Sequence, residues 1–310
     1  MSQNNPLTAL LDAKPFILLD GAMATELEAR GCNLADSLWS AKVLVDNPEL
    51  IREVHLDYFR AGAQVAITAS YQATPAGFAA LGLDEAQSKA LIGKSVELAR
   101  KAREAYLAEN PQAGALLVAG SVGPYGAFLA DGSEYRGDYV RSDEEFQAFH
   151  RPRVEALLDA GADLLACETM PNFAEMKALA ELLTAYPRAR AWFSFTLRDA
   201  QHLSDGTPLR EVVAVLANYP QVVALGINCI ALENTTAALA HLHSLTALPL
   251  VVYPNSGEYY DAVSKTWHRH GEACATLAEY LPQWLAAGAK LIGGCCRTTP
   301  KDIAELNARR

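Results

Sequence analysis

Several features that mark whole classes of protein are missing from this chain of 310 residues. Its first residues, MSQNNPLTALLDAKPF, lack a basic segment followed by a long apolar run, so they do not resemble a secretory signal. No stretch approaches the roughly 20 apolar residues that a membrane span requires. We therefore expect a cytoplasmic protein that makes no contact with a membrane.

Positive charge is also scarce. The chain has 26 Lys and Arg residues against 36 Asp and Glu residues, a formal net charge of -10, and no basic stripe. Proteins that bind nucleic acids or acidic lipids usually present such a stripe. The glycine-rich segment 120–132, GSVGPYGAFLADG, has neither the pattern G-x-G-x-x-G nor the Lys-Ser/Thr of a phosphate-binding loop. We expect small-molecule partners and no nucleic acid.

Low-complexity segments and linkers rich in Pro, Gly and Ser are absent as well. Hydrophobic residues make up 51% of the chain, which is ample material for one large core. The simplest prediction is a single domain over residues 1–310. In a reducing cytoplasm the six cysteines should be free thiols, so they are candidates for core positions, metal ligands or nucleophiles before disulfides.

A short pattern recurs three times along the chain. It reads AGAQVAITAS (61–70), AGADLLACET (160–169) and AGAKLIGGCC (287–296), each after an amphipathic helical stretch. The glycine is typical of a helix end, and the apolar run is typical of a strand buried on both faces. Five further strand candidates bring the total to eight: 16–20, 115–121, 191–195, 222–229 and 248–254.

Helix start signals separate most of these strands. Asn47-Pro48, Thr207-Pro208 and Thr299-Pro300 each combine a capping residue with a proline suited to the first helical turn. Ser142 with Glu145 has the spacing of a capping box, and Asn172 precedes another amphipathic helix.

Eight alternations of strand and helix predict an α/β fold of the (β/α)8 barrel type, with an open, doubly wound sheet as the competing architecture. The long connections all follow strands: 21–46, 71–83, 120–141 and 255–271. In a barrel they would all lie on the C-terminal face, where active sites are built.

Three cysteines stand at the ends of predicted strands. Cys229 closes the sixth strand, and Cys295 with Cys296 closes the eighth, so one strand lies between them. Adjacent strand residues point to opposite faces, but Gly293-Gly294 would let the backbone leave that geometry. Three converging thiolates would form a zinc site with an open fourth position, where an incoming thiol would lose its proton. The alternative is that these cysteines simply fill core space.

The other three cysteines show no such convergence. Cys167 lies within a strand and is expected in the core, and Cys32 and Cys274 are expected to be inert. His268 and His270 form an H-x-H pair well past a strand end, which favours exposure or a bracing role in the loop over metal binding.

Polar residues are also expected at the mouth of the barrel. Asp20 ends the first strand and Glu168 the fourth, and either carboxylate could hold the ammonium group of an amino acid, or serve as a helix cap or structural ion pair. Asn228 could hydrogen-bond a substrate or brace its loop, and Asn255 is a similar case. Trp39 and Tyr71 could attract a cation with their ring faces or pack in the core.

Six segments in order along the chain resemble the homocysteine S-methyltransferase family: LDGAMATEL (19–27), GSVGPYGA (120–127), ETMPN (168–172), GINC (226–229), YPNSG (253–257) and GGCC (293–296). The likeness is greatest to the stand-alone bacterial and plant type that uses S-methylmethionine. It implies one Zn²⁺ per chain, held by Cys229, Cys295 and Cys296, with the homocysteine sulfur in the fourth position. It also implies that Asp20, Glu168 and Asn228 bind substrate.

The resemblance implies methyl transfer from a small sulfonium donor to the thiol of homocysteine, forming methionine. The chain ends soon after Cys296, so we expect no folate-binding or cobalamin-binding module. S-methylmethionine is the first choice of donor, S-adenosylmethionine the second and betaine the third. A zinc hydrolase on the same barrel and a non-catalytic protein with structural zinc are the rival hypotheses.

Overall fold

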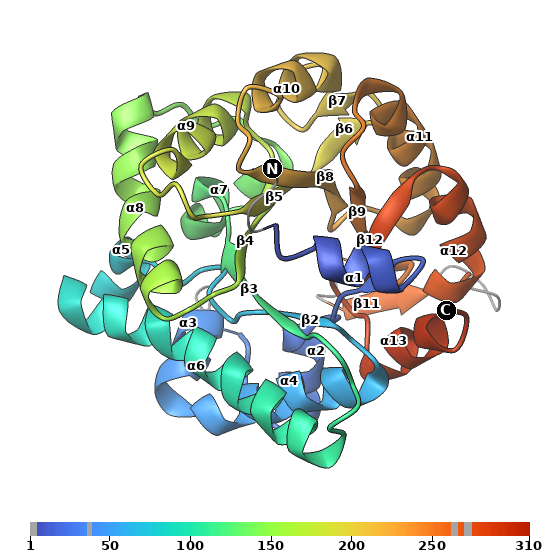
Figure 1. Ribbon diagram of the computed structural model, residues 1–310. Coiled ribbons are helices and arrows are strands. Elements are labelled where there is room, and N and C mark those ends of the chain that lie inside the picture. The colour runs from blue at the N-terminus through green and yellow to red at the C-terminus, as the bar shows by residue number, and fades with distance from the viewer. Residues whose placement is uncertain (1–4, 36–38, 262–265, 270–274) are drawn as a thin grey trace.

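The computed structural model is a barrel of eight parallel strands surrounded by helices (Figure 1). It describes residues 5–35, 39–261, 266–269 and 275–310, and side chains within 259–274 are not described. Neighbouring strands follow the order β1-β12-β9-β8-β5-β4-β3-β2. A parallel bridge between Leu19, which follows β1, and Val65 of β2 joins the two ends of this order and closes the barrel. The predicted (β/α)8 barrel is therefore confirmed, and the open sheet is excluded.

The barrel strands are short. Their bounds are β1 Ile17–Leu18, β2 Val65–Ile67, β3 Leu117–Val122, β4 Leu164–Met170, β5 Ala191–Phe195, β8 Val222–Asn228, β9 Leu250–Tyr253 and β12 Ala289–Ile292. Two antiparallel hairpins stand outside the barrel, namely β6 Leu197–Asp199 with β7 His202–Leu203, and β10 Glu258–Asp261 with β11 Thr266–Arg269.

The helices fall into two groups. Those that alternate with the barrel strands are α4 Pro48–Ala61, α6 Glu85–Glu109, α8 Asp143–Asp159, α9 Phe173–Leu183, α10 Leu209–Leu216, α11 Thr235–Leu245, α12 Leu277–Ala286 and α13 Pro300–Asn307. The others lie before the first strand or in the connections: α1 Thr8–Ala13, α2 Met23–Ala29, α3 Trp39–Asp46, α5 Pro75–Ala79, α7 Tyr125–Leu129, and the 3-10 helices η1 Ser133–Tyr135 and η2 Leu232–Asn234.

The apolar side chains form two main layers. One layer fills the barrel itself and includes Val65, Trp192 and Val251. The larger layer lies between the strands and the helices. Leu7 and Leu10 belong to the inner layer, which places α1 across the N-terminal end of the barrel, as Figure 1 shows. The barrel is thus packed at that end, and its open end is the C-terminal face.

Most of the predicted helix starts are confirmed. Ser142 and Glu145 form the expected capping box, and the Asn172 side chain accepts a hydrogen bond from the Glu175 N–H at 2.9 Å. Pro48 and Pro300 stand in the first turns of α4 and α13. The prediction for Thr207-Pro208 is wrong by one residue, because Pro208 itself precedes the first residue of α10, and the Thr207 carbonyl accepts a hydrogen bond from the Leu203 N–H at 2.9 Å.

The long connections lie where they were expected, after the carboxyl ends of the strands. They carry the additional helices and the hairpin β10–β11, and they build the walls above the barrel mouth. Among the helices that the structure describes, none combines the length and the apolar character needed to cross a membrane.

Candidate metal centre and substrate pocket

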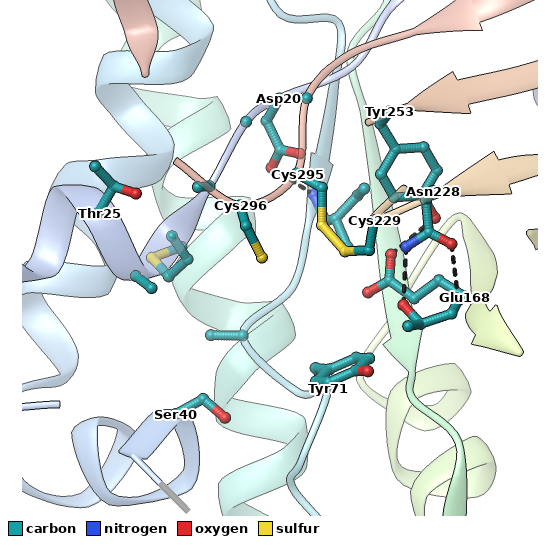
Figure 2. A pocket seen from close by; sticks show the side chains of 18 of the residues that line it. Asp20, Thr25, Ser40, Tyr71, Glu168, Asn228, Cys229, Tyr253, Cys295 and Cys296 are labelled. Carbon is teal, nitrogen blue, oxygen red and sulfur yellow. Dashed lines mark hydrogen bonds between the residues drawn. A yellow bond between two sulfur atoms is a disulfide. The ribbon is translucent and has the colours of Figure 1, made fainter. Parts of the chain in front are cut away.

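A cavity of about 340 Å³ opens at the carboxyl ends of the strands. Side chains from the barrel strands and from several connections line it, and Figure 2 labels some of them. All six residues that the sequence selected for the site are among them: Asp20, Glu168, Asn228, Cys229, Cys295 and Cys296. The barrel therefore brings together positions that lie up to 276 residues apart in the chain.

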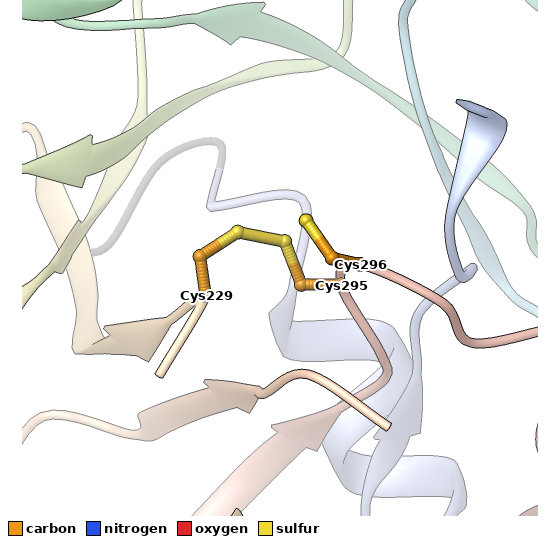
Figure 3. A group of neighbouring side chains, drawn as sticks. All are labelled: Cys229, Cys295 and Cys296. Atoms are coloured by element: carbon orange, nitrogen blue, oxygen red, sulfur yellow. A yellow bond between two sulfur atoms is a disulfide. The ribbon is translucent and has the colours of Figure 1, made fainter. Parts of the chain in front are cut away.

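The three cysteines meet beside this cavity. Their sulfur atoms all lie within 4.8 Å of one another, and each residue is half-buried (Figure 3). β8 and β12 are separated only by β9, as the strand count predicted. This group of sulfurs could hold a metal ion.

Two of the three sulfurs are bonded to each other in this structure. Cys229 and Cys295 form a disulfide with their Cα atoms 5.4 Å apart, whereas Cys296 is free. The expectation that all six cysteines are free thiols is wrong for this pair, because the segments that follow β8 and β12 hold the two Cα atoms at a distance that suits a disulfide. Since thiolates and not disulfides ligate metals, this bond and a three-sulfur metal site exclude each other.

The backbone leaves strand geometry at both cysteine segments. Cys229 follows the last residue of β8 and has a left-handed φ of 51°. β12 already ends at Ile292, so Cys295 and Cys296 follow the strand instead of closing it. A Cβ on Gly293 would lie 2.6 Å from Leu19 Cβ, and one on Gly294 would lie 2.4 Å from Thr298 Oγ1. Both glycines are therefore required by close packing, and neither has a left-handed φ, so their predicted part in turning the chain stays a prediction.

Glu168 lies inside β4, two residues before its end, and not at the end as predicted. Its side chain accepts hydrogen bonds from Ser121 Oγ at 2.6 Å and from Tyr253 OH at 2.8 Å. Burial raises the pKa of the Glu168 carboxyl, while these two hydrogen bonds oppose that rise. Its described hydrogen-bond partners are hydroxyl groups, which favours neither a helix cap nor a structural ion pair.

Asp20 lies two residues beyond β1, next to Cys295 in Figure 2. It is only 4% exposed, and its Oδ2 accepts a hydrogen bond from the Ile67 N–H at 2.8 Å. Burial raises its pKa well above the ordinary value, the Ile67 hydrogen bond opposes this, and the negative charge of Glu168 adds to the rise. Two buried acids at one cavity create a local demand for positive charge.

Asn228 braces two strand ends. Its Oδ1 accepts hydrogen bonds from Thr169 N and Ser194 Oγ, both at 2.8 Å, and its Nδ2 donates to Thr169 Oγ1 at 2.8 Å. Thr169 has a left-handed φ of 60°, a conformation that a β-branched residue adopts only when its surroundings impose it. The bracing alternative for Asn228 therefore has direct structural support.

The remaining candidate residues from the sequence lie in different places. Trp39 and Tyr71 both line the cavity, whereas Cys167 is fully buried in the core. Asn255 does not line the cavity, although its Oδ1 is buried and has no hydrogen-bond partner among the described residues. His268 lies in β11 opposite Tyr259, and its side chain is not described. His270 and Cys274 lie outside the described residues.

Sequence reasoning missed the residues that hold Glu168. Tyr253 is the last residue of β9, and its OH also receives a hydrogen bond from Trp192 Nε1 at 3.0 Å. Ser121 lies in β3. A polar residue at the carboxyl end of a barrel strand was the available signal, and Tyr253 carries it within the segment YPNSG.

Comparisons with known proteins agree with this geometry. The sequence profile of the family described as "Homocysteine S-methyltransferase" matches residues 17–310. Homocysteine S-methyltransferase from Escherichia coli K12 is 88% identical over the full length of both chains. A homocysteine S-methyltransferase from Bacillus subtilis is 53% identical, with 98% of this chain and 97% of that protein covered.

Solved structures give the same result. The metallated form of the homocysteine methyltransferase MmuM from Escherichia coli superposes with a TM-score of 0.92 at 82% identity, covering 99% of this chain and 100% of that chain. The oxidized form of that enzyme matches with the same TM-score, identity and coverage. The chain therefore belongs to the homocysteine S-methyltransferase family, and its activity is methyl transfer to homocysteine.

Proposed function

We propose that the chain transfers a methyl group from S-methylmethionine to the thiol of L-homocysteine, with one zinc ion held by Cys229, Cys295 and Cys296. The convergence of three sulfurs on a cavity with two buried carboxylates carries this proposal. S-adenosylmethionine is the second choice of donor and betaine the third. Residues 1–310 would act as one homocysteine-binding domain in the cytoplasm.

The donor set suits zinc. Three cysteine sulfurs within 4.8 Å of one another match a zinc site with three protein ligands and one exchangeable position. When bound there, zinc would supply a lowered pKa for the homocysteine thiol, whose unperturbed value is about 8.5. Sulfur ligands are a poor choice for making hydroxide from water, which argues against the hydrolase. Among the residues that the structure describes, the group offers three ligands, whereas structural zinc sites commonly have four, which argues against a purely structural site.

The chain's own residues would orient the substrate. Glu168 and Asp20 would accept hydrogen bonds from the ammonium group of homocysteine, whose positive charge offsets the cost of burying two carboxylates. Asn228 would contact the substrate from beside Cys229 while it holds Thr169 in place. The barrel's main contribution would be to align two substrates in a site sheltered from water.

The transfer itself is a single displacement. The homocysteine sulfur forms a bond to the methyl carbon, the bond between that carbon and the donor sulfur breaks, and its electron pair stays on the donor sulfur. A thiolate and a sulfonium become two neutral thioethers, so a cavity of low polarity favours the transition state over separated ions. With S-methylmethionine as donor, both products are methionine.

A methyl-transfer assay tests this proposal. Protein reduced to break the Cys229–Cys295 disulfide and loaded with zinc should form methionine from homocysteine and S-methylmethionine, and a chelator should abolish the activity. Unreduced protein should bind less than one zinc ion per chain, because its disulfide removes two of the three ligands. Parallel reactions with S-adenosylmethionine and betaine rank the donors. Protein that carries one zinc ion and makes no methionine from any donor would sink the proposal.

Removing the charge of Glu168 should weaken homocysteine binding. We expect Glu168→Gln to raise the KM for homocysteine roughly tenfold to a hundredfold, because a charge-assisted hydrogen bond contributes about 1.5–3 kcal/mol. The KM for the donor should change little. The matched control is Glu181→Gln, which alters an exposed carboxylate that also accepts a hydrogen bond from a tyrosine, Tyr219 OH at 2.8 Å. An unchanged KM for homocysteine would remove Glu168 from the substrate site.

A further inference from the structure

Glu134 is an acidic residue of the cavity that the reaction described above does not use. It lies in η1, in the connection between β3 and β4, and it lines the cavity together with Tyr135 and Tyr71. Its Oε2 is buried and has no hydrogen-bond partner. Among the lining residues that the structure describes, Glu134 is the only one with a buried side-chain oxygen or nitrogen that has no hydrogen-bond partner.

The backbone around Glu134 is held firmly. The Glu134 carbonyl accepts a hydrogen bond from Thr196 Oγ1 at 2.7 Å, and the Ser133 carbonyl accepts one from the Gly137 N–H at 2.8 Å. A Cβ on Gly126 would lie only 2.6 Å from Glu134 N, so this glycine lets α7 pack closely against η1. The carboxylate is therefore placed at the cavity by packing and hydrogen bonds and is not carried on a loosely attached loop.

Glu134 is half-buried, and it differs from Glu168 and Asp20, the two buried acids of the cavity, in its partners. Glu168 has two hydroxyl donors and Asp20 has the Ile67 N–H, whereas the buried oxygen of Glu134 has none. Burial raises the pKa of the Glu134 carboxyl, and the negative charge of Asp131 adds to this rise, whereas a hydrogen bond from its own backbone N–H and the positive charge of Arg136 oppose it. Because the pKa stays raised and the buried Oε2 has no hydrogen-bond partner, keeping this carboxylate charged costs free energy. A cation in the cavity would remove that cost.

The surroundings of Glu134 favour a cation that donates no hydrogen bonds. Tyr71 and Tyr135 line the same cavity, and the negative charge of Glu134 adds to the rise that burial causes in the pKa of Tyr71, which places aromatic rings within its electrostatic reach. Aromatic faces attract cations. An ammonium group needs acceptors for three N–H bonds, but a sulfonium has none to satisfy, so one carboxylate oxygen and ring faces suffice for it.

We propose that Glu134 is the specificity-determining residue for the methyl donor and that its carboxylate recognises the positive charge of the sulfonium sulfur. This inference rests on the proposed function, in which the donor is a sulfonium. The attraction exists in the bound donor and declines as the donor sulfur becomes a neutral thioether. It therefore lowers the KM for the donor without raising kcat.

The test compares a charged donor with a neutral molecule of the same shape. The probes are S-methylmethionine and 2-amino-5-methylhexanoate, in which a CH group replaces the sulfonium sulfur and the ammonium and carboxylate are kept. Their dissociation constants are measured by calorimetry on reduced, zinc-loaded protein. The unmodified chain should prefer S-methylmethionine by at least about tenfold, because opposite charges in a partly dry cavity attract strongly.

Glu134→Gln should abolish this preference and raise the donor KM by the same factor, with kcat not lowered. Glu134→Asp, which keeps the charge, should retain most of the preference. The control is Asp138→Asn, which removes a carboxylate that pairs with Arg136 in the same connection and does not line the cavity. It should leave both dissociation constants unchanged.

Two results would overturn the assignment. One is an undiminished preference for S-methylmethionine in Glu134→Gln. The other is an equal loss of affinity for both probes, which would place Glu134 at the ammonium group or give it a purely structural role. Failure of the proposed function is recognised separately, because the unmodified chain would then form no methionine from S-methylmethionine.

Discussion

Cys296→Ser should abolish methyl transfer to homocysteine and release the metal. Cys296 is one of the three sulfurs that converge at the cavity, and it is the one that is not part of the disulfide. A serine hydroxyl is a much weaker ligand for zinc than a thiolate, and two sulfurs alone do not make a site with three protein ligands. We expect activity to fall by more than about a thousandfold, because the means of deprotonating the homocysteine thiol is lost.

The measurement pairs zinc content with methionine formation in the same reduced preparations. Cys296→Ser should carry well under one zinc ion per chain and keep a normal unfolding transition. The matched control is Cys32→Ser, since Cys32 is also half-buried but lies outside the sulfur group. It should retain both zinc and activity. Full activity in Cys296→Ser would mean that the sulfur group is not the catalytic centre.

The barrel could be predicted because local patterns repeat. The segments AGAQVAITAS and AGAKLIGGCC contain the barrel strands β2 and β12, and AGADLLACET contains all of β4 but its last residue. Once eight parallel strands are known to close, the residues after their carboxyl ends must face one opening. That rule alone placed Asp20, Cys229 and Cys295 together. The predicted ends of the strands were less accurate, since Glu168 was expected at the end of a strand and lies inside β4.

The contacts that complete the site could not be read from the sequence. Tyr253 and Ser121 reach Glu168 from different strands, and that meeting depends on strand register and barrel tilt, which no local pattern encodes. The left-handed conformation of Thr169 is imposed by the Asn228 side chain from another strand. Glu134 lies in a connection whose path is set by its packing against Gly126 and Thr196.

A buried charged network is a further feature that no sequence pattern indicated, and it supports the wall of the cavity. Arg153 of α8 is fully buried and donates to the carbonyls of Tyr71 at 2.7 Å and Gly123 at 2.6 Å. It also donates to His150 Nδ1 at 3.0 Å, and His150 Nε2 then donates to Glu175 Oε2 at 2.7 Å. Burial lowers the pKa of His150, so a neutral imidazole bridges the two charges.

Arg153→Met should therefore destabilise the fold strongly. The substitution fills similar space but leaves the Tyr71 and Gly123 carbonyls without this donor and leaves the carboxylate of Glu175 buried without its cation. Breaking a buried ionic network in this way costs about 3–5 kcal/mol. We expect a corresponding loss in the free energy of unfolding by urea, and a raised KM for the donor at temperatures where the variant is folded, because Tyr71 lines the cavity. The control is Arg100→Met, which removes an exposed arginine bonded to the Ala160 carbonyl at 3.1 Å.

The double variant Arg153→Met with Glu175→Gln separates charge from packing. If the main cost is an uncompensated negative charge, neutralising Glu175 should restore roughly half of the lost free energy of unfolding, even though a second residue of the network has changed. The Tyr125 N–H, which donates to Glu175 Oε2 at 2.6 Å, keeps an acceptor in the amide oxygen if that oxygen takes the same place. The KM for the donor should remain raised, because the Tyr71 carbonyl still lacks its donor. If the double variant instead loses the sum of the free energies of unfolding lost by Arg153→Met alone and by Glu175→Gln alone, the two residues stabilise the wall independently.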